Sequence, residues 1–410
     1  MSRLDELLRE LCPNGVEYKK LGEVATISRG GNFQKKDYVA EGVPCIHYGQ
    51  IYVHYNLFVE ETISFISWET AKKQKYAEPN DIIMAVTSEN VDDVCKCVAW
   101  LGNEKVAVSG HTAIIHHSLN PKYLVYFLSS DHFYKQKTKL AHGTKVIEVT
   151  PDKLVDIVLP VPPLAVQSEI VRILDNFTEL TAELTAELTA ELTARKKQYE
   201  YYRDQLLHLD GERITIQDLF DTRNGFTPSK DNPEFWEDGT LPWFKLDDIN
   251  DKGRVLSESY LHITPKALKK SGLFAENSII ISTSATIGEY ALITVPFLCN
   301  QRFTCMTVKP KYKSRVNIKY LMHYCPVLSK YCKEHLNQGN FASVDMKQFV
   351  KFEFVIPSME EQNRIVSILD RFDALCNDIS SGLPAEIEAR QKQYEYYRDR
   401  LLTFEEKPTK

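Results

Sequence analysis

The chain contains one long segment twice. The first copy runs from Gln167 to Leu207 and the second from Gln362 to Leu402, so their starts lie 195 residues apart (362 − 167) and no gap is needed. About 23 of the 41 aligned positions are identical, far above chance for an internal repeat. A chain built this way is expected to have two structurally equivalent halves.

Both copies have the composition of long helices, since Ala, Leu, Glu, Lys, Gln and Arg dominate them. The first copy contains no Gly or Pro, and at about 1.5 Å per residue it predicts a rod of roughly 60 Å. Its apolar residues recur at three- and four-residue steps and predict one apolar stripe: Ile170, Ile173, Leu174, Phe177, Leu180, Leu184, Leu188 and Leu192.

The second copy is interrupted at mid-length by Ser380-Ser381-Gly382-Leu383-Pro384. Glycine and proline break helices, and serine caps a new start. We therefore expect one straight and one interrupted rod, paired antiparallel along their leucine stripes.

The segments before the two copies share short matching sequences, which we call the frame. The residues between these matches, which we call the filling, differ between the two segments. Leu21-Gly22-Glu23-Val24 matches Ile216-Gln217-Asp218-Leu219 at the same offset, whereas the residues between such anchors diverge almost completely. Short β-rich runs separated by Gly, Asn and Pro predict α/β domains there. The expected fold is α+β: two α/β domains at 1–160 and 211–357, separated by two long antiparallel helices at 161–210 and 358–410, with a pseudo-twofold internal repeat.

The composition excludes several classes of protein. With 43% hydrophobic and 26% charged residues in 410, the chain is typical of soluble globular proteins. No run approaches the roughly 18 apolar residues of a membrane span, and no signal peptide is evident. Nine cysteines without a C-x-x-C pair favour reduced thiols, so a cytoplasmic location without membrane contact is expected.

Motifs for catalysis are missing. The sequence has no phosphate-binding G-x-x-x-x-G-K-[ST], no G-x-G-x-x-G after a strand, no Asn/Asp-Pro-Pro-aromatic tetrapeptide and no H-E-x-x-H. His116-His117, Asp92-Asp93 and Asp247-Asp248 are interpreted as a strand end and exposed loops rather than metal ligands. We predict no catalytic residue, no metal ligand and no cofactor bound by this chain.

Each filling combines basic residues with amides and hydroxyls, which suit phosphates and base edges. A lysine run alone is more often a solvated face. Two Arg-x-Gly-type loops in the same frame, beginning at Arg29 and Arg223, nevertheless favour double-stranded DNA as the partner. The predicted DNA contacts are Arg29, Asn32, Gln34, Lys35, Lys36, Lys137, Lys145, Arg223, Asn224, Thr227, Ser229, Lys230, Lys311, Lys313 and Arg315.

The helices themselves are predicted to avoid DNA, because Glu183, Glu187 and Glu191 form an acidic row that phosphates would repel. The Tyr-Glu-Tyr-Tyr-Arg-Asp blocks have an interface composition. Packing of these blocks against the α/β domains and docking of a partner protein stay open as alternatives. The residues predicted to form the spacer and partner interface are Leu180, Leu184, Leu188, Leu192, Tyr199, Tyr202, Arg203, Tyr394, Tyr397 and Arg398.

The whole chain resembles a specificity subunit of a type I restriction-modification system. The resemblance rests on I-V-x-I-L-D-x-F at Ile170–Phe177 and Ile365–Phe372, and on R-x-K-Q-Y-E-Y-Y-R-D at Arg195–Asp204 and Arg390–Asp399. Tandem Thr-Ala-Glu-Leu units, from Thr181 to Leu192, are similar to the hallmark of the type IC subgroup.

The resemblance implies a non-catalytic subunit whose two target-recognition domains read a bipartite DNA site. It also implies modification (methyltransferase) subunits, expected to be two, that use S-adenosylmethionine, and restriction (motor-nuclease) subunits that use ATP and Mg²⁺. Two other classes stay open at this point: an enzyme with an active site hidden in one filling, and a coiled-coil adaptor that touches only proteins.

Overall fold

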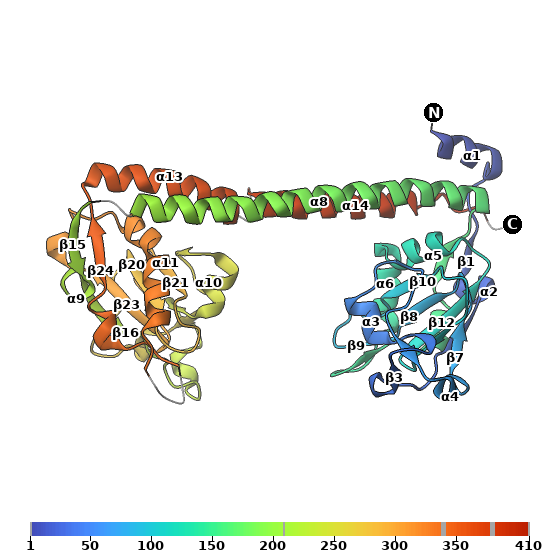
Figure 1. Cartoon of the computed structure of the whole chain (residues 1–410), viewed down its shortest axis with the longest axis horizontal. Helices are drawn as coiled ribbons and strands as arrows, with labels where there is room; N and C mark the ends of the chain where they lie inside the picture. Colours follow the sequence, from blue (N-terminus) through green and yellow to red (C-terminus); the bar gives the residue numbers. More distant parts are fainter. Residues whose placement is uncertain (1, 208–209, 338–341, 378–381, 409–410) are drawn as a thin grey trace. The chain divides into compact units, whose positions relative to one another are not determined.

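The structure is a computed structural model that describes residues 2–207, 210–337, 342–377 and 382–408 (Figure 1). It forms two compact units. Unit 1 comprises Met1–Ala186 with Glu388–Lys410, and unit 2 comprises Glu187–Ile387. Each unit therefore combines one sheet-rich part with half of each helical segment.

The repeated segments are helical, as predicted. The first forms one 44-residue helix, α8 (Leu164–Leu207). The second forms α13 (Met359–Asn377) and α14 (Leu383–Leu401), with Pro384 in the first turn of α14, where a missing N–H is tolerated. Gly382 is a bend directly before α14, whereas residues 378–381, which include Ser380 and Ser381 of the predicted interruption, lie outside the described residues.

Within each unit the helices run antiparallel. In unit 1 the Phe177 ring lies 6.0 Å from the Tyr397 ring, and the Thr178 hydroxyl lies 3.0 Å from the Tyr394 hydroxyl. In unit 2 the rings of Tyr199 and Tyr202 lie 6.4 and 5.8 Å from Phe372 of α13.

Two five-stranded sheets form the body of unit 1. The first has the order β2-β12-β8-β10-β5, in which only β10 and β5 pair in parallel. The second has the order β3-β6-β4-β11-β7. Their bounds are β2 (Ala25–Arg29), β12 (Thr112–His117), β8 (Ile82–Ala85), β10 (Cys97–Trp100), β5 (Phe58–Val59), β3 (Tyr38–Val39), β6 (Phe65–Ile66), β4 (Val43–Ile46), β11 (Val106–Val108) and β7 (Lys75–Ala77).

Apolar side chains on both faces of the first sheet are buried, which explains its continuous hydrophobic runs. Ile83 and Ile114 pack with Val106 and Val108 of the second sheet, whereas Ile82 and Ile115 pack with the helices on the other face. The helices of unit 1, besides those above, are α1 (Arg3–Leu11), α2 (Leu21–Val24), α3 (Tyr48–Val53), α4 (Trp68–Ala71), α5 (Pro121–Leu128), α6 (Asp131–Leu140), α7 (Pro151–Leu154) and the 3-10 helix η1 (Lys35–Asp37).

Unit 2 repeats the topology of the first sheet despite its different sequence. Its order β16-β23-β20-β21-β18 has the same pattern of antiparallel pairs, with one parallel pair at the β18 edge. A three-stranded sheet, β19-β17-β22, packs beside it. The bounds are β16 (Phe220–Asn224), β23 (Phe303–Val308), β20 (Ser278–Ser282), β21 (Tyr290–Ile293), β18 (Val255–Leu256), β19 (Leu261–Ile263), β17 (Leu241–Phe244) and β22 (Leu298–Cys299).

The frame predicted from the matched anchors is a small sheet in each unit. β1 (Tyr18–Lys20) pairs with β14 (Val158–Pro160), and β15 (Glu212–Thr215) pairs with β24 (Glu353–Ile356) in the same register at the 195-residue offset. The remaining elements are β9 (Thr87–Ser88) and β13 (Ile147–Glu148) in unit 1, and α9 (Ile216–Leu219), α10 (Leu246–Lys252), α11 (Ile318–Glu334), α12 (Met346–Phe349), η2 (Pro233–Phe235), η3 (Pro265–Ala267) and η4 (Pro310–Tyr312) in unit 2.

Candidate functional site

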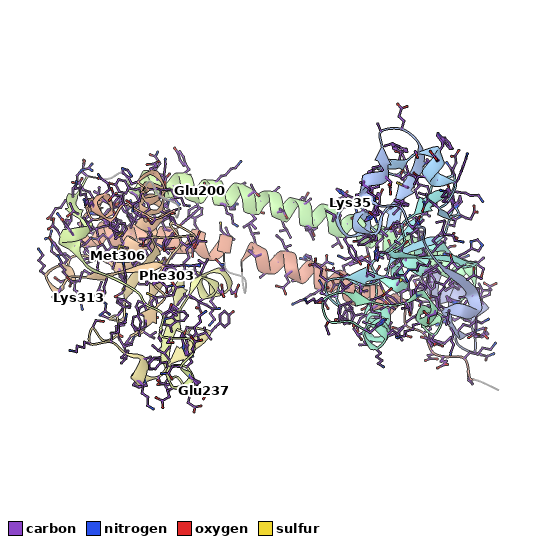
Figure 2. All side chains as sticks on the ribbon, turned by 90° about the horizontal axis from the view of Figure 1, so that it is seen from below. Lys35, Glu200, Glu237, Phe303, Met306 and Lys313 are labelled. Carbon is purple, nitrogen blue, oxygen red and sulfur yellow. The ribbon has the colours of Figure 1, made fainter. Side chains whose placement is uncertain are left out.

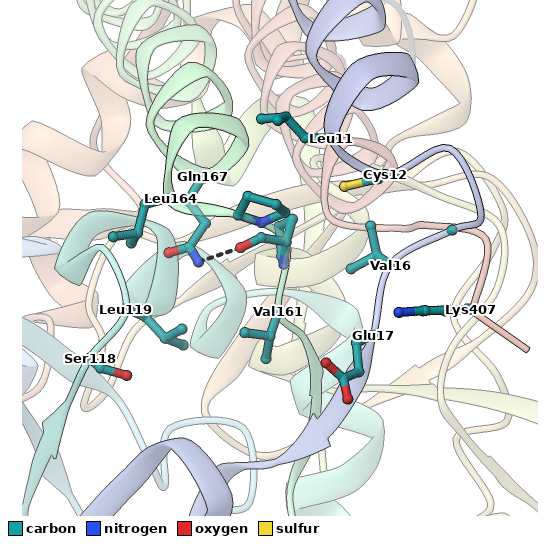
Figure 3. A pocket seen from close by; sticks show the side chains of 13 residues that line it. Leu11, Cys12, Val16, Glu17, Ser118, Leu119, Val161, Leu164, Gln167 and Lys407 are labelled. Atoms are coloured by element: carbon teal, nitrogen blue, oxygen red, sulfur yellow. Dashed lines mark hydrogen bonds between the residues drawn. The ribbon is translucent and has the colours of Figure 1, made fainter. Parts of the chain in front are cut away.

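One buried glutamine in each unit ties the start of its long helix to the sheet-rich part. In unit 1 the Gln167 amide donates to Pro162 O at 2.7 Å and accepts from Asn120 N at 2.8 Å (Figure 3). In unit 2 the Gln362 amide donates to Pro357 O at 2.9 Å and accepts from Asn317 N at 2.8 Å. Because these two glutamines align in the repeat, the junction is built the same way twice.

Replacing Gln362 by alanine is expected to lower the free energy of unfolding by about 2 kcal/mol, because the substitution strands buried backbone partners without hydrogen bonds. Gln362 is fully buried. Urea unfolding measures the loss. Gln205→Ala, at an exposed position of α8, is the matched control and should change stability little. Equal effects of the two substitutions would contradict the anchoring role of Gln362.

The equivalent tyrosines Tyr199 and Tyr394 of the repeated tyrosine blocks have different hydrogen-bond neighbours in the two units. Tyr394 contacts Thr178, whereas the Tyr199 hydroxyl lies 3.3 Å from His323 Nδ1. Burial raises the pKa of Tyr199 to about 12. The Tyr199 contact with α11 supports packing against the sheet-rich part, whereas Tyr394 contacts the other long helix, α8.

The two arginines of these blocks are also engaged within their own units. Arg203 pairs with Asp204 and lies over the Tyr199 ring, and Arg398 pairs with Asp399 and lies over Tyr394. Their side chains are only 14% and 13% exposed. The two guanidinium groups therefore hold the blocks in shape, and they present little surface to a partner.

Other tyrosines of the same blocks face outward. Tyr201 and Tyr396 are 62% and 61% exposed, and each makes an edge contact with the next tyrosine, at 5.5 and 5.4 Å. Sequence reasoning named Tyr202 and Tyr397, which are 42% and 41% exposed, and missed the two more exposed residues. Of the spacer leucines, Leu180 is exposed, and Leu184, Leu188 and Leu192 are half-buried.

In unit 1 the predicted glycine loop packs tightly against its neighbours. A Cβ on Gly30 would lie 2.1 Å from Ser109 O, so glycine permits the close backbone approach. The Arg29 guanidinium donates to Gly110 O and pairs with Glu148 at 2.9 Å. Asn32 is hydrogen-bonded to Gln74. These contacts fix the loop and leave Gln34, Lys35 and Lys36 exposed beyond it.

Lys137, one of the predicted DNA contacts, is not accessible to DNA. Lys137 of α6 is buried, and its ammonium donates to the carbonyls of Asp92 and Val94 at 2.7 and 2.6 Å. Burial lowers its pKa. The side chain holds the 92–94 loop and cannot reach a ligand. Lys145, by contrast, is exposed in the turn between α6 and β13, and β13 carries the Glu148 partner of Arg29.

In unit 2 the loop after β16 is held in a similar way. Arg223 donates to the carbonyls of Ser271 and Gly272 and stacks over Phe274 at 4.1 Å. Asn224 accepts a hydrogen bond from Thr304, and Thr227 donates to Gln301.

Near the loop after β16, some exposed residues were predicted as DNA contacts and others were not. Ser229 and Lys230 are exposed, as are Gln301 and Arg302 at the neighbouring turn before β23. Sequence reasoning missed Gln301 and Arg302 because no basic run marks them.

Strand pairing separates the two basic regions predicted for unit 2. β16 and β23 are antiparallel, with Asn224 opposite Thr304 and Phe220 opposite Val308. The loop after Asn224 therefore lies at one end of this pair, and the run Lys311, Lys313 and Arg315 lies at the other. Figure 2 shows Phe303 and Met306 along β23 and Lys313 beyond its end. Arg315 pairs with Glu212 of β15, so this run belongs to the helix-side end of the unit.

Two histidines of unit 1 lie in surroundings that disfavour protonation: His47 is buried near Lys35, and His117 is half-buried at the other end of the β2-β12 pair, opposite Ala25. Burial lowers the pKa of His47 to about 4, and Lys35 and His111 act in the same direction. Burial also lowers the pKa of His117 to about 4. His47 caps α3 by accepting from Gly49 N at 3.2 Å.

Lowering the pH from 7 to 5 is expected to reduce the free energy of unfolding by about 2 kcal/mol for each of these histidines. In the unfolded chain the two histidines are protonated below about pH 6.5, whereas in the folded chain they are protonated only below about pH 4. The free energy of unfolding therefore falls as the pH is lowered from 6.5 to 4. Urea unfolding of His47→Asn, which keeps a capping oxygen, should show about half of this pH dependence lost. His54→Asn, at an exposed position, is the control, and an unchanged slope in His47→Asn would refute the assignment.

Within the described ranges, no group of three or more His, Cys, Asp or Glu side chains is placed to hold a metal ion. All nine cysteines lie in those ranges and are free. None of the helices described there is both long and apolar enough to cross a membrane.

The family described as the type I restriction modification DNA specificity domain matches residues 13–194 and 210–389. The chain belongs to this family. It is 47% identical over 213 residues to the EcoprrI specificity subunit of Escherichia coli, covering 50% of this chain and 53% of that one. It is 41% identical over 259 residues to the EcoR124I/EcoR124II specificity subunit of the same species, covering 60% and 61%. These matches span little more than half of each relative.

A solved structure of a type I restriction-modification system, concerned with its complex assembly and conformational transition, is similar in fold. The TM-score is 0.71 at 16% identity, over 96% of this chain and 98% of that chain. The predicted α+β architecture with duplicated sheet-rich domains is therefore confirmed.

Proposed function

We propose that this chain is the DNA-specificity subunit of a type I restriction-modification complex. Each sheet-rich part would read one half of a bipartite, asymmetric DNA target. The supporting observation is the pairing of one strand topology, present in both units, with two unrelated sets of edge loops. A shared scaffold with different loops suits two half-sites of different sequence, because bases are read by side chains at the edge and phosphates position the scaffold.

The repeated helical segments would bind two modification subunits, and the Thr-Ala-Glu-Leu units of the first segment would set the spacer between half-sites. Restriction subunits would join this complex in the cytoplasm. S-adenosylmethionine, ATP and Mg²⁺ would serve those partner subunits, and this chain would contribute no catalytic residue.

Replacing residues 212–357 by the corresponding part of another specificity subunit is expected to change one half of the DNA target and preserve the other. Methylation of a target library by the assembled complex measures both halves. The reciprocal replacement, of residues 21–157, is the matched control and should change only the other half. A simultaneous change in both halves would contradict modular reading.

Incorporation of a labelled methyl group by the purified chain alone would instead favour the enzyme alternative. The chain with its modification subunits is the positive control for this assay.

A further inference from the structure

Five lysines of unit 1 gather at the end of its second sheet. Lys35 and Lys36 belong to η1, Lys72 and Lys73 follow α4, and Lys75 begins β7. All five are exposed. In Figure 1, β3, α4 and β7 lie at the end of unit 1 that is remote from α8. We call these residues, with Trp68, the lysine strip.

Hydrogen bonds make the strip one continuous surface. Gln74 accepts from Asn32 N at 2.8 Å and donates to Asn32 Oδ1 at 3.3 Å. β3 begins directly after η1, β6 ends two residues before Trp68, and the antiparallel pairing of Tyr38 with Ile66 brings η1 and the start of α4 to the same edge. Segments that are about 40 residues apart therefore form one edge with the glycine loop.

The strip is left unneutralised. Elsewhere in unit 1, Lys19, Lys20, Lys96, Lys105, Lys122 and Lys135 each pair with a carboxylate. Among the residues described, no lysine of the strip forms an ion pair. Residues 30–37 and 67–77 hold five lysines against Asp37 and Glu69, and Asp37 accepts from Gln34 N. Like charges held together repel one another, so the arrangement favours a polyanionic ligand.

Trp68 adds an aromatic surface to this charge. Its side chain is 73% exposed at the first position of α4, and Ser67 caps that helix by accepting from Thr70 N at 3.1 Å. Lysines next to an exposed ring suit a sugar-phosphate backbone better than an acidic protein, because the ring can pack on deoxyribose while the ammonium groups neutralise phosphates.

We propose that the lysine strip binds the DNA backbone outside the bases read by unit 1, with Lys72, Lys73 and Lys75 on phosphates and Trp68 against the sugars. This inference rests on the proposed function. Lys72, Lys73 and Lys75 lie outside the glycine loop, so they add phosphate contacts that the loop does not provide. These contacts strengthen binding to every DNA sequence alike.

The test measures DNA affinity against salt concentration for the full chain assembled with its modification subunits. Lys72→Ala/Lys73→Ala/Lys75→Ala is expected to reduce the slope of log Kd against log salt by about 2 to 3, because each phosphate contact contributes about 0.9. The affinity should fall for cognate and non-cognate DNA by the same factor. Lys19→Ala/Lys20→Ala/Lys105→Ala removes the same net charge at ion-paired sites and should leave the slope unchanged.

The fluorescence of Trp68 provides an independent measurement of the same contact. DNA should protect a fraction of the tryptophan fluorescence from acrylamide, and Trp68→Phe should abolish that protection. An unchanged slope in the strip variant, with sequence-specific binding intact, would overturn the inference and leave the proposed function standing. Absence of sequence-specific binding by the wild-type complex would overturn both.

Discussion

Replacing Tyr201 and Tyr396 together by alanine is expected to abolish assembly with modification subunits. The two residues occupy equivalent positions of the repeat and are exposed to the same extent, 62% and 61%. Exposed tyrosines on rigid helices are typical anchors of protein interfaces, and truncating such an anchor costs about 2 kcal/mol or more, roughly 30-fold in affinity. At protein concentrations between the wild-type Kd and about 30 times that value, each single substitution should therefore remove one of two bound partners.

The masses of the assembled complexes measure this directly. Wild type should carry two modification subunits, each single variant one, and the double variant none. Tyr260→Ala removes a similarly exposed tyrosine outside the helices, at 52% exposure, and should retain both partners. Two partners bound to either single variant would show that the tyrosine blocks are not the docking surface.

The helices could be predicted from the sequence because their signals are local. Helix-forming residues without glycine or proline determine α8, and Gly382 lies in a bend directly before the start of α14 at Leu383. Strand topology depends instead on distant pairs. Val43–Ile51, for example, has the composition of one strand, but β4 ends at Ile46 because His47 caps α3.

Candidate contacts were harder to predict, because a lysine's neighbours decide its role. Lys135, Lys137 and Lys139 look equivalent in sequence, yet Lys137 alone is buried. Its spacing of four residues from buried Phe133 was the available signal, since residues four apart share a helix face. Arg29 and Arg223 lie in the predicted loops, but their guanidinium groups donate hydrogen bonds to neighbouring backbone carbonyls. Arg29 also pairs with Glu148.

Deleting Thr185–Leu188 is expected to shorten the preferred spacer of the DNA target by one base pair and to leave both half-sites unchanged. These residues lie within α8, which is continuous through both units. Removing four residues shortens a helix by about 6 Å and rotates its C-terminal remainder by roughly 40° beyond a full turn. One base pair of B-DNA advances about 3.4 Å and rotates by about 34° at roughly 10.5 pairs per turn.

The rotation caused by removing four helical residues nearly matches the rotation of one base pair. The helix shortens by more than the rise of one base pair, and a helix inclined to the DNA axis accommodates this difference. The leucine stripe stays continuous after a four-residue deletion, since Leu184 then precedes the next unit in the same phase. Deleting only Ala186 and Glu187 rotates the rest of the stripe by about 200° and should abolish assembly. Binding to targets that differ only in spacer length distinguishes the outcomes. A correctly folded four-residue deletion with an unchanged spacer optimum would show that the units extend α8 without measuring the DNA.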